Sequence, residues 1–388
     1  MIIGLGKEIK TAESRVGLLP EQVIDLIGDR HRLLVETGAG EKAGFSDLQY
    51  KEKGADIVSK EVLYKTSQMV IKVKCPLESE YGYLQDGQIL FTYLHFDEDI
   101  SPEKIEKIIS RGITGIAYEW VEENGDYLLL RPMSEITGVL FALQSMKLLI
   151  EKKGLLPGEF LENVKPPTAL VIGMGKIGTN ALKVFLMNGM KVIIIEKSIE
   201  NINERAKFYI GEELWCRTET KREIIQFDNE YPDKTIRQIE CLLPTCDIVL
   251  NCAVRGTDLP KSKMEYLITR QMLSRMRKGS IICDATACNR NMIETSISSE
   301  NLYETYEIDG IVHYSCDHIP ALVPRISSVL LAKKTYPYIK LLADMGFSKA
   351  VQEKKSLFNA VMCHRGKLTH ELTSVKKNIS FTNLKDLL

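Results

Sequence analysis

The stretch "TALVIGMGKIGTNALKVFLMNGMKVIIIEKS", residues 168–198, decides how this chain folds. A short apolar strand runs directly into the glycine motif GMGKIG (173–178), a helical pattern follows and ends near Gly189, and a second apolar strand ends at Glu196. A lone Gly-x-Gly-x-x-Gly is a weak signal, but between a strand and a helix it is typical of a turn that binds a dinucleotide. The stretch therefore predicts a nucleotide-binding βαβ unit.

Each glycine of the motif has its own physical role. Gly173 permits the tight turn, Gly175 lets the backbone approach a pyrophosphate, and Gly178 lets the helix pack closely on the strand. The start of the helix faces the negative charge of the phosphates. We predict that the cofactor-binding residues here are Gly173, Gly175, Lys176, Ile177, Gly178 and Glu196.

Glu196 indicates which dinucleotide is bound. It lies 23 positions after Gly173, where a carboxylate accepts hydrogen bonds from the hydroxyls of the adenosine ribose. Because a carboxylate repels a 2′-phosphate, we predict NAD as the cofactor and regard NADP as the weaker alternative.

Three more apolar segments extend the sheet of this domain. The segments are "CDIVLNCAV" (246–254), "GSIICDATA" (279–287) and "IVHYSCD" (311–317), and "TRQMLSRMRKG" (269–279) predicts a helix that ends at Gly279. In a doubly wound sheet the carboxyl ends of parallel strands form the ligand crevice. We therefore add Cys252, Ala253 and Val254 to the predicted cofactor site.

The remaining chain predicts a second α/β domain. Strand and helix signals alternate over the first 130 residues, residues 134–152 predict one long helix, and the Gly- and Pro-rich segment 154–167 is a boundary. The polar segment 198–237 predicts helices and a long surface loop. A chain of 388 residues also exceeds what one hydrophobic core normally supports.

Composition limits the possible partners. The chain is 44% hydrophobic and 27% charged, with a formal net charge of −1, which argues against a general binder of nucleic acid or anionic membranes. It has no apolar run of transmembrane length and no signal-peptide core, so we expect a cytoplasmic location. The nine cysteines include no Cys-x-x-Cys spacing, so we predict buried thiols at Cys246 and Cys252 and no metal.

Several motifs resemble the alanine dehydrogenase family, which shares its fold with the first component of proton-pumping transhydrogenase. They include "KEIKTAESRVGLLP" (7–20), "LLVETGAG" (33–40), "MVIKVKCPL" (69–77), "LFTYLHF" (90–96), "RPMSEITG" (131–138), "IVHYSCDHIPALVPRISS" (311–328) and "GKLTHEL" (366–372). The resemblance implies two Rossmann-like domains with a deep interdomain cleft. It places the substrate domain at 1–135 and 319–388, with the NAD-binding domain, 136–318, inserted between these parts.

The resemblance also implies roles for single residues. Arg15 would bind the substrate carboxylate, a task that suits its planar two-pronged fork. Lys74 would stabilise charge on the substrate carbonyl, and His95 would be the acid–base catalyst. Tyr93 and Met133 would contact the substrate; Ser134 and His318 would contact the cofactor.

Two positions depart from the family pattern. In "DATACNRN" (284–291), Asp284 keeps the first acid of the family loop, but Cys288 stands where a second, catalytic acid is usual, and Arg290-Asn291 replace a glycine run. The pair Asp317-His318 resembles lysine-forming saccharopine dehydrogenase, a relative with the same two-domain plan.

Three functions remain open on the sequence. The first is an NAD(H)-dependent amino-acid dehydrogenase that converts an L-amino acid to its 2-oxo acid and ammonia. The second is a reductive condensation of a 2-oxo acid with an amino acid, as in saccharopine dehydrogenase or N5-(carboxyethyl)ornithine synthase. The third is a catalytically weakened dinucleotide-binding protein. In each case the resemblance implies a homo-oligomer.

Overall fold

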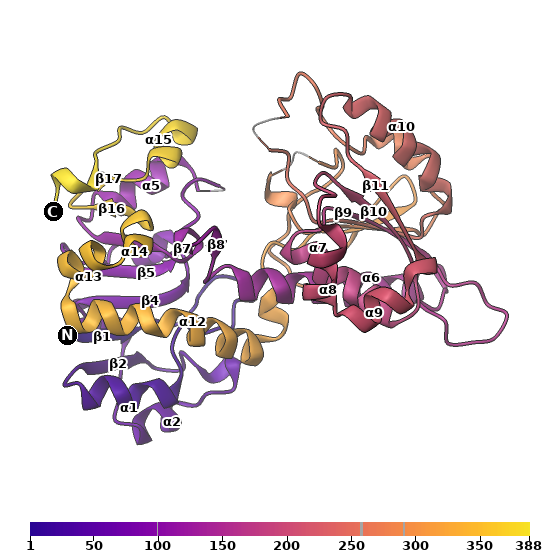
Figure 1. Cartoon of the computed structure of the whole chain (residues 1–388). Helices are drawn as coiled ribbons and strands as arrows, with labels where there is room; N and C mark the ends of the chain where they lie inside the picture. Colours follow the sequence, from indigo (N-terminus) through magenta and orange to yellow (C-terminus); the bar gives the residue numbers. More distant parts are fainter. Residues whose placement is uncertain (99, 257–258, 290–291) are drawn as a thin grey trace. The chain divides into compact units, whose positions relative to one another are not determined.

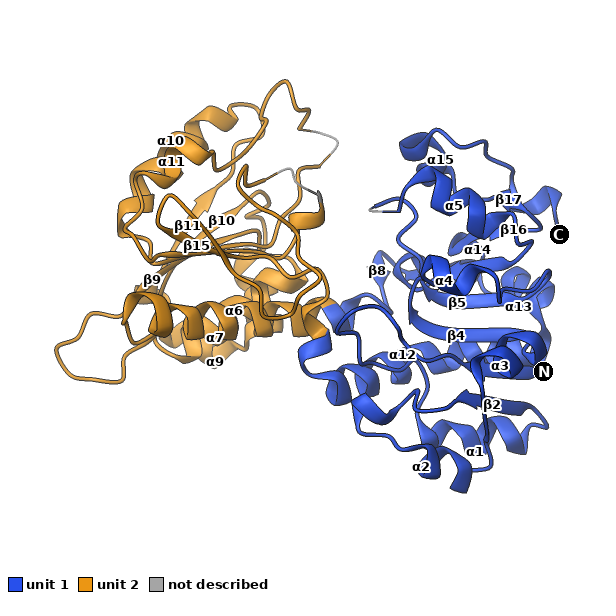
Figure 2. Ribbon diagram, turned by 180° about the vertical axis from the view of Figure 1, so that it is seen from behind, with its two compact units in different colours: residues 1–133, 321–388 blue, residues 134–320 orange. Residues whose placement is uncertain are grey.

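A computed structural model of the chain describes residues 1–98, 100–256, 259–289 and 292–388. These residues form two compact units, which Figure 2 colours separately. Unit 1 comprises Met1–Met133 and Ala321–Leu388, and unit 2 comprises Ser134–Pro320. Each unit is built on a mainly parallel sheet, so the predicted α/β class with two Rossmann-like domains is confirmed. The cleft between the domains stays a prediction.

Unit 1 contains an eight-stranded sheet in the order β17-β16-β6-β5-β4-β1-β2-β3. The first six strands of the chain pair in parallel, whereas β16 pairs antiparallel with β6 and with β17. The strands are β1 (Ile2–Leu5), β2 (Arg32–Glu36), β3 (Asp56–Val58), β4 (Met69–Lys74), β5 (Ile89–Tyr93), β6 (Thr114–Ala117), β16 (Val361–His364) and β17 (Lys367–Leu368). A separate hairpin joins β7 (Glu122–Glu123) to β8 (Asp126–Tyr127).

The helices of unit 1 come from both ends of the chain. Figure 1 shows the yellow C-terminal segment beside the indigo and violet N-terminal strands. The helix α5 begins with Pro102 in the first position, and the Ser101 hydroxyl caps it by accepting from the Lys104 amide. The helices are α1 (Pro20–Gly28), α2 (Asp47–Glu52), α3 (Lys60–Thr66), α4 (Glu78–Tyr81), α5 (Pro102–Ile109), α12 (Pro324–Met345), α13 (Phe347–Glu353), α14 (Lys355–Asn359) and α15 (Glu371–Lys377).

Unit 2 contains a seven-stranded sheet in the order β11-β10-β9-β12-β13-β15-β14, with only β14 antiparallel to its neighbour. The strand order reverses between β9 and β12, and this switch point is where doubly wound sheets bind ligands. The strands are β9 (Thr168–Ile172), β10 (Lys191–Glu196), β11 (Arg222–Gln226), β12 (Ile248–Asn251), β13 (Ile281–Asp284), β14 (Tyr306–Ile308) and β15 (Ile311–Tyr314). The helices that lie wholly in unit 2 are α7 (Lys176–Met187), α8 (Ile202–Ile210), α9 (Glu212–Arg217), α10 (Pro232–Leu242) and α11 (Arg270–Leu273).

The helix α6 (Arg131–Lys153) runs across the boundary between the units. By length and composition alone it could cross a membrane, but 50% of its most apolar window is buried inside the structure. Core helices of soluble proteins have the same length and composition, so α6 by itself decides nothing about a membrane.

One prediction about secondary structure was wrong, and another was incomplete. The helix predicted over 269–279 is only the single turn α11, and the irregular residues after it still bring Met276 into the same core as Met272 and Leu273. The segment 198–237, predicted as helices and loop, also contains β11. Edge strands are often charged and half-buried, so β11 lacks the apolar alternation that marks a strand.

Candidate active site

Three polar side chains predicted to act on the substrate come from the carboxyl ends of adjacent strands in unit 1. Strands β5, β4 and β1 lie side by side in the sheet. Lys74 is the last residue of β4, His95 follows β5 by two residues, and Arg15 lies on the loop after β1. The carboxyl ends of neighbouring parallel strands share one edge, so residues from three separate segments of the sequence are gathered there.

Arg15 is buried and paired with Glu13. Its Nε donates to Oε1 of Glu13 at 2.8 Å, and its Nη2 donates to Oε2 at 2.6 Å. Burial alone would raise the pKa of Glu13, but the guanidinium outweighs it and lowers that pKa to about 2. Two of the five guanidinium N–H donors are therefore taken by Glu13. Nη1 lies 3.1 Å from the Sδ of Met133, so Met133 and this edge of Arg15 are brought together.

Lys74 is the last residue of β4, and the buried carboxylate of Glu8 holds the end of this strand in place. Oε1 of Glu8 accepts from the amides of Val73, at 2.6 Å, and Lys74, at 3.3 Å. Burial raises the pKa of Glu8 to about 7, although the Lys72 ammonium opposes the shift. The charge of Lys74 contributes to the lowered pKa of both Glu13 and Glu98.

His95 occupies an unusual backbone position. Its φ of 50° lies in the left-handed region, which costs energy for a residue with a side chain. The carboxylate of Glu119 offsets this cost by accepting from the amides of Leu94 and His95, the latter at 2.6 Å. The imidazole stacks on Tyr93, with ring centroids 5.6 Å apart.

Tyr93 is buried and does not offer its hydroxyl to a substrate. That hydroxyl donates to the Leu129 carbonyl at 2.7 Å, and burial raises its pKa. We place Tyr93 as the wall on which His95 rests. Sequence reasoning had missed the carboxylates Glu8, Glu13, Glu98 and Glu119; Glu8 and Glu13 lie within the family-like segment 7–20, which was their only signal.

In unit 2 the glycine motif lies at the switch point of the sheet. Gly173 has a φ of 86°, and a Cβ there would lie 2.9 Å from that of Ala253 after β12. A Cβ on Gly178 would lie 1.9 Å from the Gly173 carbonyl oxygen. A Cβ on Gly175 would meet no described atom within 4 Å, and no side chain caps the helix α7 that follows. This open space at a helix N-terminus fits a pyrophosphate.

A cavity of about 320 Å³ adjoins the motif. The predicted cofactor residues that line it are Gly173, Gly175, Glu196, Cys252, Ala253 and Val254. Apolar side chains such as Phe227 and Leu259 complete a wall suited to an adenine ring. Lys176, Ile177 and Gly178 begin α7 instead and do not line the cavity.

Glu196 is held in place by the backbone around it. Its Oε2 accepts from the Met174 amide at 2.5 Å and its Oε1 from the Ser198 amide at 3.0 Å. The guanidinium of Arg205 lies 3.7 Å away. The carboxylate is thus fixed at the end of β10, where ribose hydroxyls would reach it.

The strand β13 ends at a buried acid. Asp284 is buried, and its Oδ1 accepts from the Asn251 amide group at 2.8 Å and from the Thr286 backbone at 2.9 Å. Burial raises the pKa of Asp284 against these hydrogen bonds. Cys283 packs in the core and Cys288 is half-buried. Arg290 and Asn291 lie outside the described residues.

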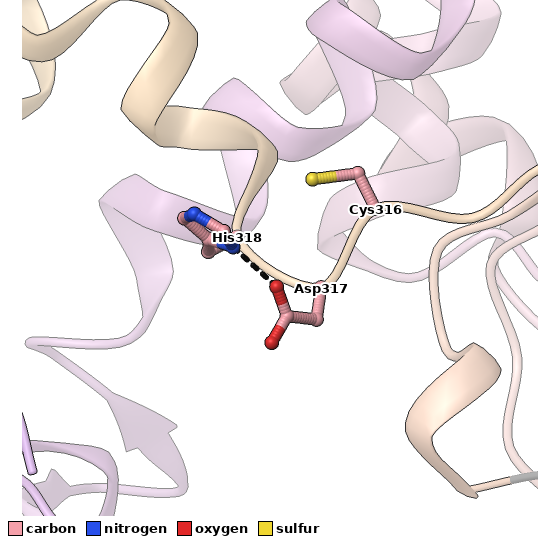
Figure 3. Close-up of side chains that lie close together, drawn as sticks. All are labelled: Cys316, Asp317 and His318. Carbon is pink, nitrogen blue, oxygen red and sulfur yellow. Dashed lines mark hydrogen bonds and ion pairs between the residues drawn. The ribbon is translucent and has the colours of Figure 1, made fainter. Parts of the chain in front are cut away.

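Figure 3 shows His318 beside Asp317 and Cys316. The Asp317 carboxylate is hydrogen-bonded to Nδ1 of the fully buried imidazole. One ligand atom from each of the three side chains lies within 4.8 Å of the others, yet the residues are consecutive and two already pair with each other. The absence of a metal stays a prediction. The roles of Ser134, half-buried in α6, and of His318 at the cofactor also stay predictions.

These features define a two-unit α/β protein with a dinucleotide-binding fold in unit 2. The family models for the N-terminal and C-terminal domains of alanine dehydrogenase/PNT match residues 4–137 and 139–371. The chain belongs to this alanine dehydrogenase/PNT family.

Individual relatives match over nearly the whole chain. The chain is 34% identical to the alanine dehydrogenase of Bacillus subtilis (strain 168), covering 96% of this chain and 93% of that protein. It is 33% identical to that of Methanococcus maripaludis, covering 98% of both. A solved L-alanine dehydrogenase superposes with a TM-score of 0.83 at 31% identity, covering 100% of both chains. A transhydrogenase from Sinorhizobium meliloti, at 20% identity and a TM-score of 0.73 over 96% of this chain and 99% of that one, shares the fold.

Proposed function

We propose that the protein is an NAD(H)-dependent alanine dehydrogenase. It would reversibly deaminate L-alanine, or a similar L-amino acid, to the 2-oxo acid and ammonia. The observation that carries this proposal is the placement of Arg15, Lys74 and His95 at the carboxyl ends of three adjacent strands. Full-length similarity to alanine dehydrogenases supports it.

Each side chain suits one part of the reaction. The Nη1 edge of Arg15, beside Met133, would bind the substrate carboxylate. The Lys74 ammonium would stabilise negative charge that develops on the carbonyl oxygen. His95 would give a proton to the hydroxyl that leaves as water during amination, and would take it back during deamination.

The dinucleotide would supply or accept the hydride at the α-carbon. In the amination direction, the 2-oxo acid, ammonium, NADH and a proton give the L-amino acid, NAD⁺ and water. Unit 2 would hold the pyrophosphate at Gly175 and the ribose at Glu196. The fixed carboxylate of Glu196 favours NAD over NADP because a 2′-phosphate would be repelled.

Glu196→Ala should test this cofactor preference. Each lost charge-assisted hydrogen bond costs roughly 1.5–3 kcal/mol, so NADH should bind at least about 10-fold more weakly. The affinity for NADPH should fall much less, so the difference between the affinities for NADH and NADPH should become smaller. Equal affinity of the unmutated protein for NADH and NADPH would contradict the proposal.

A turnover screen separates this function from its alternatives. The protein is mixed with NADH and pyruvate, with either ammonium or a panel of L-amino acids, and NADH absorbance is followed. We expect ammonium-dependent oxidation. Oxidation that needs an amino acid would instead indicate opine-type condensation, and tight NADH binding without turnover a weakened dinucleotide-binding protein. The pair Asp317-His318 motivates the condensation alternative. Cys288, which stands where the family usually has an acid, motivates the weakened binding protein.

We also propose that the protein works in the cytoplasm as a homo-oligomer, with small-molecule substrates and no nucleic-acid, membrane or metal partner. Light scattering of the purified protein tests the oligomer, and a mass equal to one chain would contradict it.

A further inference from the structure

His95 has one ring nitrogen that lacks a conventional partner. Its Nδ1 is buried and makes no hydrogen bond of good geometry among the described residues. Oε2 of Glu98 lies 3.1 Å from this nitrogen, on the same turn and three residues further along the chain. The side chains of His95 and Glu98 are 24% and 39% exposed, so the pair lies at the edge of the solvent.

The charge of Glu98 depends on its neighbours. Burial raises the pKa of Glu98, but the adjacent His95 ring, with the charges of Lys74 and Lys376, outweighs burial and lowers that pKa. Glu98 is thus an anion near neutral pH. The other titratable groups that face His95 are Glu119, whose carboxylate binds the His95 amide, and Tyr93, whose ring stacks on the imidazole.

We propose that Glu98 is the positioning residue for His95: its carboxylate holds Nδ1–H, so that Nε2 is the atom that exchanges a proton with the substrate. This inference rests on the proposed function, in which His95 is the acid–base group. Glu98 touches neither the substrate nor the cofactor in this account.

The chemistry explains why such a partner matters. A neutral imidazole carries its proton on one nitrogen only, and the hydrogen bond made by that nitrogen decides which one it is. A carboxylate at Nδ1 leaves the Nε2 lone pair as the base and stabilises the imidazolium that forms. Glu98 belongs to the same unit as His95 and provides a fixed negative charge.

Three variants test the proposal by kinetics. Glu98→Gln should lower kcat by about 10-fold, less than the loss of about 10²-fold or more expected when the acid–base group itself is removed. KM for pyruvate and NADH affinity should change little. Glu98→Asp should restore part of the lost kcat. The limb of the pH–rate profile that depends on His95 should move to lower pH in Glu98→Gln, because a charge that favours the imidazolium is gone.

Asp97→Asn is the matched control. It removes the same charge one residue away, but Asp97 bonds Trp120 Nε1 at 3.3 Å and pairs with Lys376 at 3.0 Å, not with His95. It should keep kcat and the pH profile close to those of the unmutated protein. An equal loss of kcat in Asp97→Asn and Glu98→Gln would show that Glu98 acts only through the local negative electrostatic potential, and would overturn the proposal.

A second measurement does not depend on turnover. Nitrogen NMR of protein labelled at its six histidines reports ring tautomers, and the signal missing in His95→Ala identifies His95. We expect a proton on Nδ1 in the unmutated protein and a mixture in Glu98→Gln. An identical His95 tautomer in both would overturn the proposal. A protein without turnover would instead contradict the proposed function, while the tautomers would still decide the role of Glu98.

Discussion

The two sites of this protein recognise their ligands by different means. The site of unit 2 is made of backbone: glycines, a helix N-terminus and an apolar cavity, with the carboxylate of Glu196 as its polar anchor. The site of unit 1 is made of charged side chains, which buried acids hold in place. In the proposed function, unit 2 would bind the cofactor mainly by shape, and unit 1 would bind the substrate mainly by charge. Mutations in the two units should therefore separate into distinct kinetic effects.

The largest effect should come from His95→Ala. It removes the acid–base group, so kcat should fall by about 10²-fold or more. NADH affinity should stay the same because the nucleotide fold lies in unit 2. His31→Ala is the matched control. His31 lies just before the amino end of β2, at the opposite edge of the sheet, and pairs with Asp344, so its loss should leave kcat unchanged. Stopped-flow turnover and NADH titration give both constants, and a parallel loss of NADH affinity would break the division between the units.

Arg15→Lys should act on substrate binding. The charge stays, but the planar fork is lost, and a loss of roughly 1.5–3 kcal/mol corresponds to a 10- to 100-fold rise in KM for pyruvate. Arg32→Lys, at an exposed pair with Asp56, is the control and should leave KM unchanged. Steady-state kinetics measures both. An unaltered KM in Arg15→Lys would mean that Arg15 does not bind the substrate and only forms the ion pair with Glu13.

Two glycines of unit 2 should respond differently to alanine. The methyl of Gly175→Ala meets no described atom, so Tm should hold while NADH affinity falls by about 10-fold, since the methyl occupies the space of the pyrophosphate. The methyl of Gly178→Ala would lie 1.9 Å from a carbonyl oxygen, so Tm should fall by about 5 °C or more. Calorimetry and NADH titration distinguish them. Equal loss of Tm in both would show that Gly175 is a packing residue.

The smallest effect should be on the pH dependence of stability. The pKa of Glu8 is about 7 in the folded protein, against 4.5 for an ordinary glutamate carboxyl. The contribution of Glu8 to the free energy of unfolding is therefore fully present below pH 4.5 and is lost as the pH rises through 7. Glu8→Gln should remove up to about 2 kcal/mol of this decline between pH 5 and 8. Glu21→Gln, on the exposed start of α1, should keep the decline. Denaturant unfolding at several pH values checks this, and an unchanged slope in Glu8→Gln would refute the assignment.

The sequence predicts the unit 2 site far better than the unit 1 site. Backbone recognition has a local signature, because Gly173, Gly175 and Gly178 must stand at fixed spacing between a strand and a helix. Strand identity was also readable wherever the apolar runs were long. The strands β3 and β11, which are short or polar, were not predicted. They are stabilised by pairing with neighbouring strands rather than by their own composition.

The unit 1 site could be predicted only through family resemblance. Arg15, Lys74 and His95 come from three distant segments, and no periodicity brings them to one sheet edge. The roles of the supporting acids could not be predicted from local sequence. Glu8 contacts the end of β4 from the loop after β1, and Glu119 contacts the residues after β5 from the segment after β6. The left-handed φ of His95 likewise has no local signal, because the hydrogen bonds that stabilise it come from Glu119.

Isotope labelling can follow the hydride of the proposed reaction. The protein is supplied with NADH deuterated at the transferable position of C4, pyruvate and ammonium, and the products are identified by mass spectrometry. We expect L-alanine with deuterium on its α-carbon, formed in step with NADH oxidation. Deuterium that appears only in a secondary amine when an L-amino acid is supplied, or in lactate, would contradict the proposed reaction.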